Sequence, residues 1–292
     1  AEIGEMHVAG IVAISDDGKP IMDGNLMRRA LEYAAMFNLV VIAHEEDCNI
    51  AGGGVMNEGE MSLRLGLRGM PAAAEDAMIA RDIAILERTN GRLHIAHIST
   101  EGGVHLVREA KARGLAVTAE AAPHHFTLSE SAVAGYNTNA KMKPPLRTER
   151  DVAAVRSGLV DGTIDAIATD HAPHHRDEKE VEFDKANDGI IGLETALPLS
   201  LQLWREHGMS RARLIAALTV NPARILGLDL GTLGVGCSAD VTVIDPDATW
   251  FVDPTAMNSK SRNTPFAGVE MKGRATTTIV GGRVVWPEVG DA

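Results

Sequence analysis

The stretch IDAIATDHAPHH, residues 164–175, passes from aliphatic to polar residues within a few positions. Isoleucine and alanine residues with little charge predict a buried strand at 163–169. The strand ends at Thr169; Asp170 and His171 follow at once, and His174 and His175 come shortly after. A buried strand that ends in acidic and imidazole side chains holds them at one defined edge of a sheet. Earlier segments of the chain repeat this arrangement, and together they decide the fold.

Aliphatic strands alternate with helical patterns over the first two thirds of the chain. Four earlier strands are predicted, at 10–14, 39–43, 93–97 and 115–120. Helical spacing of apolar residues predicts helices at 24–37, 71–90, 104–113, 193–207 and 211–223. This alternation is typical of a parallel sheet with helical crossovers, and therefore of an α/β protein.

The pattern of predicted secondary structure changes near Gly227. Beyond it come short strand patterns such as ADVTVID and TTTIVGGRVVW, separated by Asp-Pro, Gly-Gly and Asn-Thr-Pro turns. We therefore predict an α/β barrel part at 1–226 and a small β domain at 227–292.

Polar side chains follow every predicted parallel strand. Asp16 and Asp17 follow the first, and the others end in His44, His97, Glu120 and Asp170. A lone histidine is usually a structural hydrogen-bonding group and a lone aspartate is usually a helix cap. In a closed barrel, however, Asp17, His44, His97 and Asp170 would meet at the face that carries the chemistry. Two imidazoles and two carboxylates without a thiolate are a ligand set for a divalent metal, with Zn²⁺ the first choice.

Composition excludes several classes of protein. The 292 residues include 28 basic and 40 acidic side chains, for a formal net charge of -12. This charge argues against nucleic acid and anionic membranes as partners, so a small anionic substrate would need local basic groups or a metal. Cys48 and Cys237 lie far apart without framework spacing, which predicts reduced thiols in a cytoplasmic protein.

An ordered set of motifs resembles the dihydroorotase family of the amidohydrolase superfamily. The motifs are ISDDG (14–18), VIAHEED (41–47), LHIAHIST (93–100), TAEAAPHHFTL (118–128), AKMKPPLR (140–147) and IATDHAPHH (167–175). NTPF (263–266) and TIVGGRVV (278–285) resemble the composite β domain of that superfamily. The resemblance covers essentially the whole chain.

The resemblance implies a TIM-type (β/α)8 barrel, of which this chain would carry strands four to eight, with a small composite β domain. It implies one or two zinc ions. Asp17 would bridge two zinc positions, and His44 and His97 would bind one of them. Asp170 would bind the other and act as the catalytic proton-transfer group.

The resemblance also implies a substrate and a reaction. The enzyme would interconvert N-carbamoyl-L-aspartate and (S)-dihydroorotate in pyrimidine biosynthesis. His174 matches a substrate-contacting histidine, and Gly189 matches a backbone contact to the pyrimidine ring, with Asp188 beside it. Lys143 stands where the family usually has a substrate-contacting Asn, and it can hold an anionic group or be a solvated loop residue.

One family feature is missing. An HxH pair followed by an Arg precedes these motifs in the family, and this chain has no HxH. Five strands cannot close a barrel that needs eight. We therefore expect either that an N-terminal portion of roughly a hundred residues or more is missing, as typical βα lengths require, or that another chain supplies it.

Other functions remain open. Allantoinase or dihydropyrimidinase is a neighbouring possibility, but those relatives usually carry a carboxylated lysine where Asp17 stands. A catalytically inactive relative that serves as a structural partner of aspartate transcarbamoylase is a second one. A homo-oligomer is expected.

Overall fold

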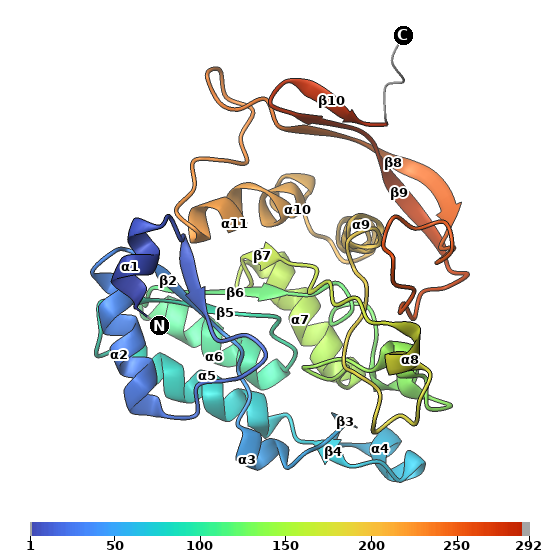
Figure 1. The fold of residues 1–292 in the computed structure, drawn as a ribbon, viewed down its shortest axis with the longest axis horizontal. Coiled ribbons are helices and arrows are strands. Elements are labelled where there is room, and N and C mark those ends of the chain that lie inside the picture. The colour runs from blue at the N-terminus through green and yellow to red at the C-terminus, as the bar shows by residue number, and fades with distance from the viewer. Residues whose placement is uncertain (1, 288–292) are drawn as a thin grey trace.

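The computed structural model describes residues 2–287. Five parallel strands form the central sheet in the order β1-β2-β5-β6-β7 (Figure 1). These strands are β1 (Ala13–Ser15), β2 (Val40–Ala43), β5 (Arg92–Ile95), β6 (Val117–Ala121) and β7 (Ala166–Ile167). All five predicted strands are present, each within a few residues of its expected position. The predicted α/β class and the parallel sheet are therefore confirmed.

Helices connect the parallel strands. They are α2 (Gly24–Ala35), α5 (Ala73–Leu86), α6 (Glu101–Ala112) and α7 (Glu149–Asp161). Helix α2 begins where the carboxylate of Asp23 accepts hydrogen bonds from the amides of Asn25 and Leu26. Its buried face consists of Met27, Leu31 and Ala34, which recur at helical spacing.

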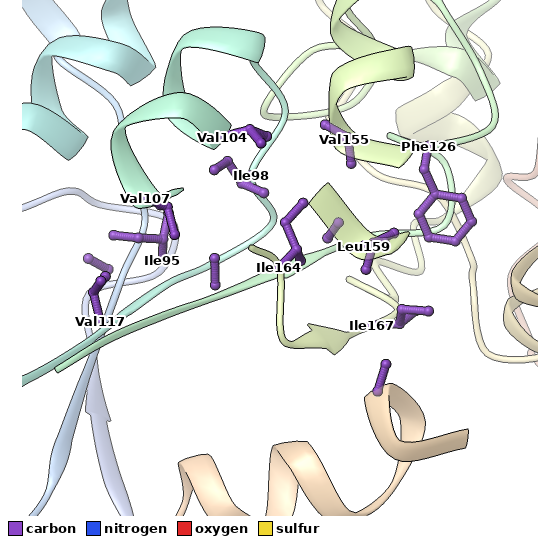
Figure 2. Close-up of a cluster of buried hydrophobic side chains, with 14 of the residues drawn as sticks. Ile95, Ile98, Val104, Val107, Val117, Phe126, Val155, Leu159, Ile164 and Ile167 are labelled. Carbon is purple, nitrogen blue, oxygen red and sulfur yellow. The ribbon is translucent and has the colours of Figure 1, made fainter. Parts of the chain in front are cut away.

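The main hydrophobic core lies between the sheet and these helices. Figure 2 shows Ile95 and Val117 of the sheet close to Val107 of α6, and Leu159 of α7 close to Ile164. Each fully buried aliphatic side chain contributes about 1.5–3 kcal/mol relative to exposure. Val40 on the alternate face of β2 belongs to a separate small cluster with Ala166 and Ile225. The sheet is therefore buried on both faces, as parallel sheets are.

Short elements line the loops beside the sheet. A two-stranded parallel ladder joins β3 (Met56–Asn57) and β4 (Gly69–Met70). The remaining short elements are α1 (Ile3–Val8), α3 (Cys48–Ala51), α4 (Glu60–Leu65), α8 (Arg176–Lys179) and the 3-10 turns η1 (Glu130–Val133) and η2 (Thr138–Ala140).

The C-terminal region forms an antiparallel sheet in the order β10-β9-β8. Its strands are β8 (Val241–Phe251), β9 (Glu270–Val280) and β10 (Arg283–Trp286), and helix α9 (Ala196–Glu206) lies beside it (Figure 1). The segment between β8 and β9 returns to the α/β part, because Met257 and Phe266 belong to the main core. The predicted division at 226/227 stays a prediction.

One predicted helix is split. The pattern at 211–223 predicts a single helix, whereas the structure has α10 (Arg211–Leu218) and α11 (Val220–Ile225). Pro222 explains the break, since its ring clashes with the carbonyl of the residue four positions earlier in a continuous helix. That residue is Leu218, where α10 ends.

Candidate metal centre

Three predicted ligands come together at one edge of the central sheet. Asp17, His44 and His97 follow the neighbouring strands β1, β2 and β5 within two residues of each strand end. Each offers one ligand atom, and these atoms lie within 4.8 Å of one another. Because parallel strands end at the same edge, residues 80 positions apart in the chain become neighbours.

The three ligand atoms form a compact triangle. Nδ1 of His44 lies 3.1 Å from Nε2 of His97 and 3.3 Å from Oδ1 of Asp17, and the third side measures 3.4 Å. Ligands of a tetrahedral zinc ion with bonds of about 2.0–2.1 Å lie about 3.3–3.4 Å apart. These residues therefore fit a zinc ion in both chemistry and spacing. Both histidines are buried, whereas the Asp17 side chain is 59% exposed, so solvent reaches the centre.

Glu46 lies on the other side of the His44 ring. Its Oε2 atom is 3.6 Å from Nε2 of His44, and its Oε1 atom is 3.0 Å from Nζ of Lys143. A carboxylate at Nε2 favours the tautomer that carries its proton there, which leaves the Nδ1 lone pair for a metal. Lys143, predicted to contact substrate, here pairs with the carboxylate that orients His44.

The charges around His44 and Asp17 stabilise each other. Burial opposes protonation of His44, but its contacts with Asp17 and Glu46 outweigh burial and raise its pKa to about 9. Hydrogen bonds from His44 and His97 hold the pKa of Asp17 well below its usual range. Burial opposes ionisation of Glu46, yet His44 and Lys143 lower the pKa of this carboxyl. The carboxylates next to His44 therefore favour a cation at this place, which is a proton or a metal ion.

Asp170 follows β7 and lies within the electrostatic reach of the same cluster. Burial raises its pKa, His97 and His44 lower it, and Asp17 and Glu120 raise it further. Its Oδ2 atom is buried without a hydrogen-bond partner among the described residues. An unpaired buried carboxylate oxygen needs a proton or a cation. The structure places Asp170 beside the predicted centre, although its carboxylate does not belong to the compact triangle.

Two carboxylates that the sequence analysis did not assign hold the strand ends in place. Asp16 accepts hydrogen bonds from the amides of His44 and Ile21, both at 2.8 Å. Glu75 of α5 accepts from the amides of Ser99 at 2.7 Å and Thr100 at 3.2 Å. These contacts fix the backbone at His44 and in the segment that follows His97. Adjacent Asp16 and Asp17 give no local signal of which one faces the backbone and which one faces the centre.

Arg147 stabilises the loop that follows His97. Its guanidinium donates to Oγ of Ser99 at 3.1 Å, to the Asn57 side chain at 3.1 Å and to the Met70 carbonyl at 3.0 Å. It also pairs with Glu75 at 3.4 Å, and both side chains are buried. Arg147 is therefore a structural residue that links the loop after His97 to the β3–β4 ladder.

Two neighbouring histidines, His124 and His125, are buried after β6. Nε2 of His125 donates to the Pro144 carbonyl at 2.9 Å. Burial lowers the pKa of His125 to about 3 and that of His124 well below its usual value. Both imidazoles are neutral in the folded protein at neutral pH.

The predicted substrate-contacting residues lie on two adjoining loops. Nε2 of His174 donates to the Asp188 carbonyl at 2.8 Å, while its Nδ1 faces Glu178 at 3.4 Å. The Gly189 amide donates to the Lys141 carbonyl at 2.9 Å. The Asp188 carboxylate lies 3.8 Å from Nζ of Lys141. The structure thus brings His174, Asp188 and Gly189 together, and their contact with substrate stays a prediction.

A basic cavity borders His174. Its volume is about 550 Å³. The ionisable side chains that line it with His174 are His175, Arg176, Lys179, Glu180, Lys260 and Arg262. Glu180 is paired with Arg176. This local excess of positive charge contrasts with the formal net charge of -12 and suits an anionic small molecule.

Comparisons with known proteins agree with these features. Residues 3–285 match the Amidohydrolase family. The chain is 58% identical over 285 residues to a dihydroorotase of Geotalea daltonii and 57% identical over 286 residues to one of Syntrophotalea carbinolica. Each match covers 98% of this chain and 67% of the relative.

Solved structures share the fold. An L-hydantoinase (dihydropyrimidinase) from Arthrobacter aurescens superposes with a TM-score of 0.86 at 28% identity, covering 97% of this chain and 66% of that one. A D-hydantoinase (dihydropyrimidinase) from Thermus sp. gives a TM-score of 0.84 at 24% identity, covering 97% and 65%. This chain thus spans about two thirds of the length of its relatives. The sheet, the ligand triangle and these similarities lead to one conclusion: the chain belongs to the amidohydrolase family.

Proposed function

We propose that this chain acts as a zinc-dependent dihydroorotase, which interconverts N-carbamoyl-L-aspartate and (S)-dihydroorotate in pyrimidine biosynthesis. The observation that carries the proposal is the triangle of Asp17, His44 and His97, whose ligand atoms lie 3.1–3.4 Å apart. The identity of 57–58% to proteins named dihydroorotase supports the choice of substrate.

Four residues would hold one or two zinc ions. Asp17, His44 and His97 form the compact set, and Asp170 lies beside them with an unpartnered buried oxygen. A bound zinc ion supplies Lewis acidity, which polarises the amide carbonyl and lowers the pKa of water. Neutral imidazoles are required for this role, and Glu46 orients the His44 ring for it.

Asp170 is the proposed proton carrier. Amide hydrolysis needs a group that takes a proton from water and returns it to the departing ring nitrogen. Asp170 follows β7 at the edge of the sheet that carries the ligands. In the reverse direction the same carboxylate would take the proton from the ureido nitrogen as the ring closes.

The positive charge of the basic cavity would attract a substrate that carries carboxylates. N-carbamoyl-L-aspartate carries two carboxylates and dihydroorotate carries one, so positive groups near His174 favour both. Lys179 is buried, and burial lowers its pKa to about 8. At neutral pH its ammonium group remains largely protonated and adds to the positive potential of this cavity.

Dihydropyrimidinase activity is the second candidate, because the A. aurescens structure carries that name. Asp17 argues against it, since those relatives usually have a carboxylated lysine at this place. Turnover of dihydroorotate and dihydrouracil by the same preparation separates the two functions. We expect turnover of dihydroorotate only.

The proposal is tested by measuring the metal content and the dihydroorotate turnover of the protein expressed from the intact open reading frame. We expect bound zinc and dihydroorotate hydrolysis, both lost in His44→Ala and His97→Ala. His105→Ala is the matched control, because His105 is 65% exposed on α6 and pairs with the exposed Glu109 at 3.2 Å. Metal-free, inactive protein would support an inactive scaffold that associates with aspartate transcarbamoylase.

We also propose a cytoplasmic location. Cys48 and Cys237 are free and exposed, as is typical of proteins in reducing compartments. Among the described residues, no helix has the length and apolarity to cross a membrane. Homo-oligomer formation stays a prediction.

A further inference from the structure

Asn263 connects the two loops that carry the proposed substrate contacts. It belongs to the NTPF segment between β8 and β9, far from both loops in sequence. Its side chain is buried, with 3% exposure, and reaches residues 172–174 on one side and Gly189 on the other. The NTPF motif thus enters the site and is more than part of the β domain.

Both polar atoms of the Asn263 amide group take part in this connection. Its Oδ1 atom accepts from the His174 amide at 3.2 Å. Its Nδ2 atom donates to the carbonyls of Ala172 at 2.8 Å and Gly189 at 3.0 Å. One acceptor and two donors, diverging from one planar group, are a set that an Asn side chain provides.

The backbone around Asn263 fixes its position. The Asn263 carbonyl accepts from the Ile191 amide at 3.0 Å. Three residues later Phe266, only 4% exposed, anchors the segment in the main hydrophobic core. The side chain therefore projects from a rigid support into the loops.

The two loops fit each other closely where Asn263 joins them. A Cβ atom at Gly189 would lie 2.6 Å from Cδ2 of His174 and 2.8 Å from the Ala172 carbonyl oxygen. Small displacements of either loop would therefore move the His174 ring. This close fit matters because displacing a group that positions the substrate by about 1 Å costs up to 100-fold in rate.

We propose that Asn263 is a positioning residue that sets the relative placement of His174 and Gly189 for substrate binding. The proposal rests on the proposed function, because it assigns substrate contacts to those two residues. Asn263 acts through the loops and belongs to no part of the metal centre. Its loss should therefore weaken substrate binding and leave metal binding intact.

The isosteric variant Asn263→Asp tests the proposal together with Asn263→Ala. Asp keeps the acceptor for the His174 amide but replaces both donors with an oxygen that repels the Ala172 and Gly189 carbonyls. We expect both variants to raise the KM for dihydroorotate by about 10-fold or more, with a smaller change in kcat and unchanged zinc content. Asn258→Ala is the matched control, because Asn258 is exposed in the same segment and bonds to Glu194 instead.

Hydrogen exchange gives a readout that does not need turnover. In the unsubstituted protein the amides of His174 and Ile191 should be protected, and Asn263→Asp should accelerate their exchange while the amides of β2 and β5 remain protected. A KM within twofold of the unsubstituted protein, or unprotected His174 and Ile191 amides in that protein, would overturn the proposal. Absence of any turnover in the unsubstituted protein contradicts the proposed function and leaves the exchange test to decide the positioning role.

Discussion

The carboxylate of Glu46 lies 3.6 Å from Nε2 of His44, on the side of the ring opposite the ligand triangle. This contact favours the tautomer of His44 that carries its proton on Nε2. Lys143, 3.0 Å from the same carboxylate, keeps Glu46 ionised and in place. Glu46 and Lys143 therefore support His44 on the side of its ring that faces away from the other two ligands.

Glu46→Gln should weaken zinc binding. Removal of a carboxylate that supports a ligating histidine typically costs 10–100-fold in metal affinity, and we expect about that loss here. Competition with a chromophoric zinc chelator measures it. Glu109→Gln is the control, since Glu109 also contacts an imidazole but both side chains are exposed. An affinity for zinc equal to that of the unsubstituted protein would show that Glu46 does not support His44.

Gly189→Ala should displace His174. The added methyl group would lie 2.7 Å from Nε2 of His174. It would also lie 2.8 Å from the carbonyl oxygen of Ala172, so the methyl group cannot avoid the ring by moving toward that carbonyl. We expect a KM for dihydroorotate at least several-fold higher, with zinc content unchanged. Gly24→Ala is the control, because a Cβ there meets only ordinary contacts of 3.6 Å or more. Equal KM values for the two variants would mean that the His174 ring has room to move.

Arg147→Met should destabilise the fold. The substitution leaves the buried Glu75 carboxylate without its cation, and breaking a buried pair in this way costs about 3–5 kcal/mol. Urea denaturation measures the free energy of unfolding. Arg150→Met removes an exposed pair with Glu101 and should cost less than about 1 kcal/mol. Similar losses in the two variants would contradict the assigned role of Arg147.

The stability of the protein should fall as the pH drops below about 6.5. His125 has a pKa of about 3 when folded, because burial opposes its protonation, and an ordinary histidine value when unfolded. Between these values the unfolded state binds more protons, so acidification favours unfolding. At about pH 5 the contribution of His125 amounts to about 2 kcal/mol.

His125→Asn removes this titration. The difference in unfolding free energy between neutral pH and about pH 5 should shrink by about 2 kcal/mol in this variant. His105→Asn, at an exposed position on α6, should leave the difference unchanged. An unaltered pH dependence in His125→Asn would show that this imidazole does not oppose acidification.

The ligand triangle could be predicted from the sequence because a simple physical rule places it. Parallel strands end at one edge, so polar residues after β1, β2 and β5 had to become neighbours. His171, next to Asp170, shows the limit of this rule. Its Nδ1 atom accepts from the Gly192 amide at 3.0 Å, so the imidazole holds a loop.

Long-range polar contacts left no local signal. The pairing of Arg147 with Glu75 spans 72 positions, and Asn263 reaches Gly189 across 74. Neither periodicity nor composition encodes such partners.

Helix α7 is a different case, because the capping box of Thr148 and Asp151 marks its start in the sequence, yet it is absent from the predicted helices.

The attachment of the His174 and Gly189 loops to Asn263 separates substrate recognition from the chemistry of the metal centre. The proposed metal chemistry depends on residues that follow the strands β1, β2, β5 and β7, whereas the placement of the substrate-contacting loops depends on Asn263 near the end of the chain. Substitutions around residue 263 offer a route by which selection, or an engineer, can alter which cyclic amide is accepted without disturbing the hydrolytic machinery.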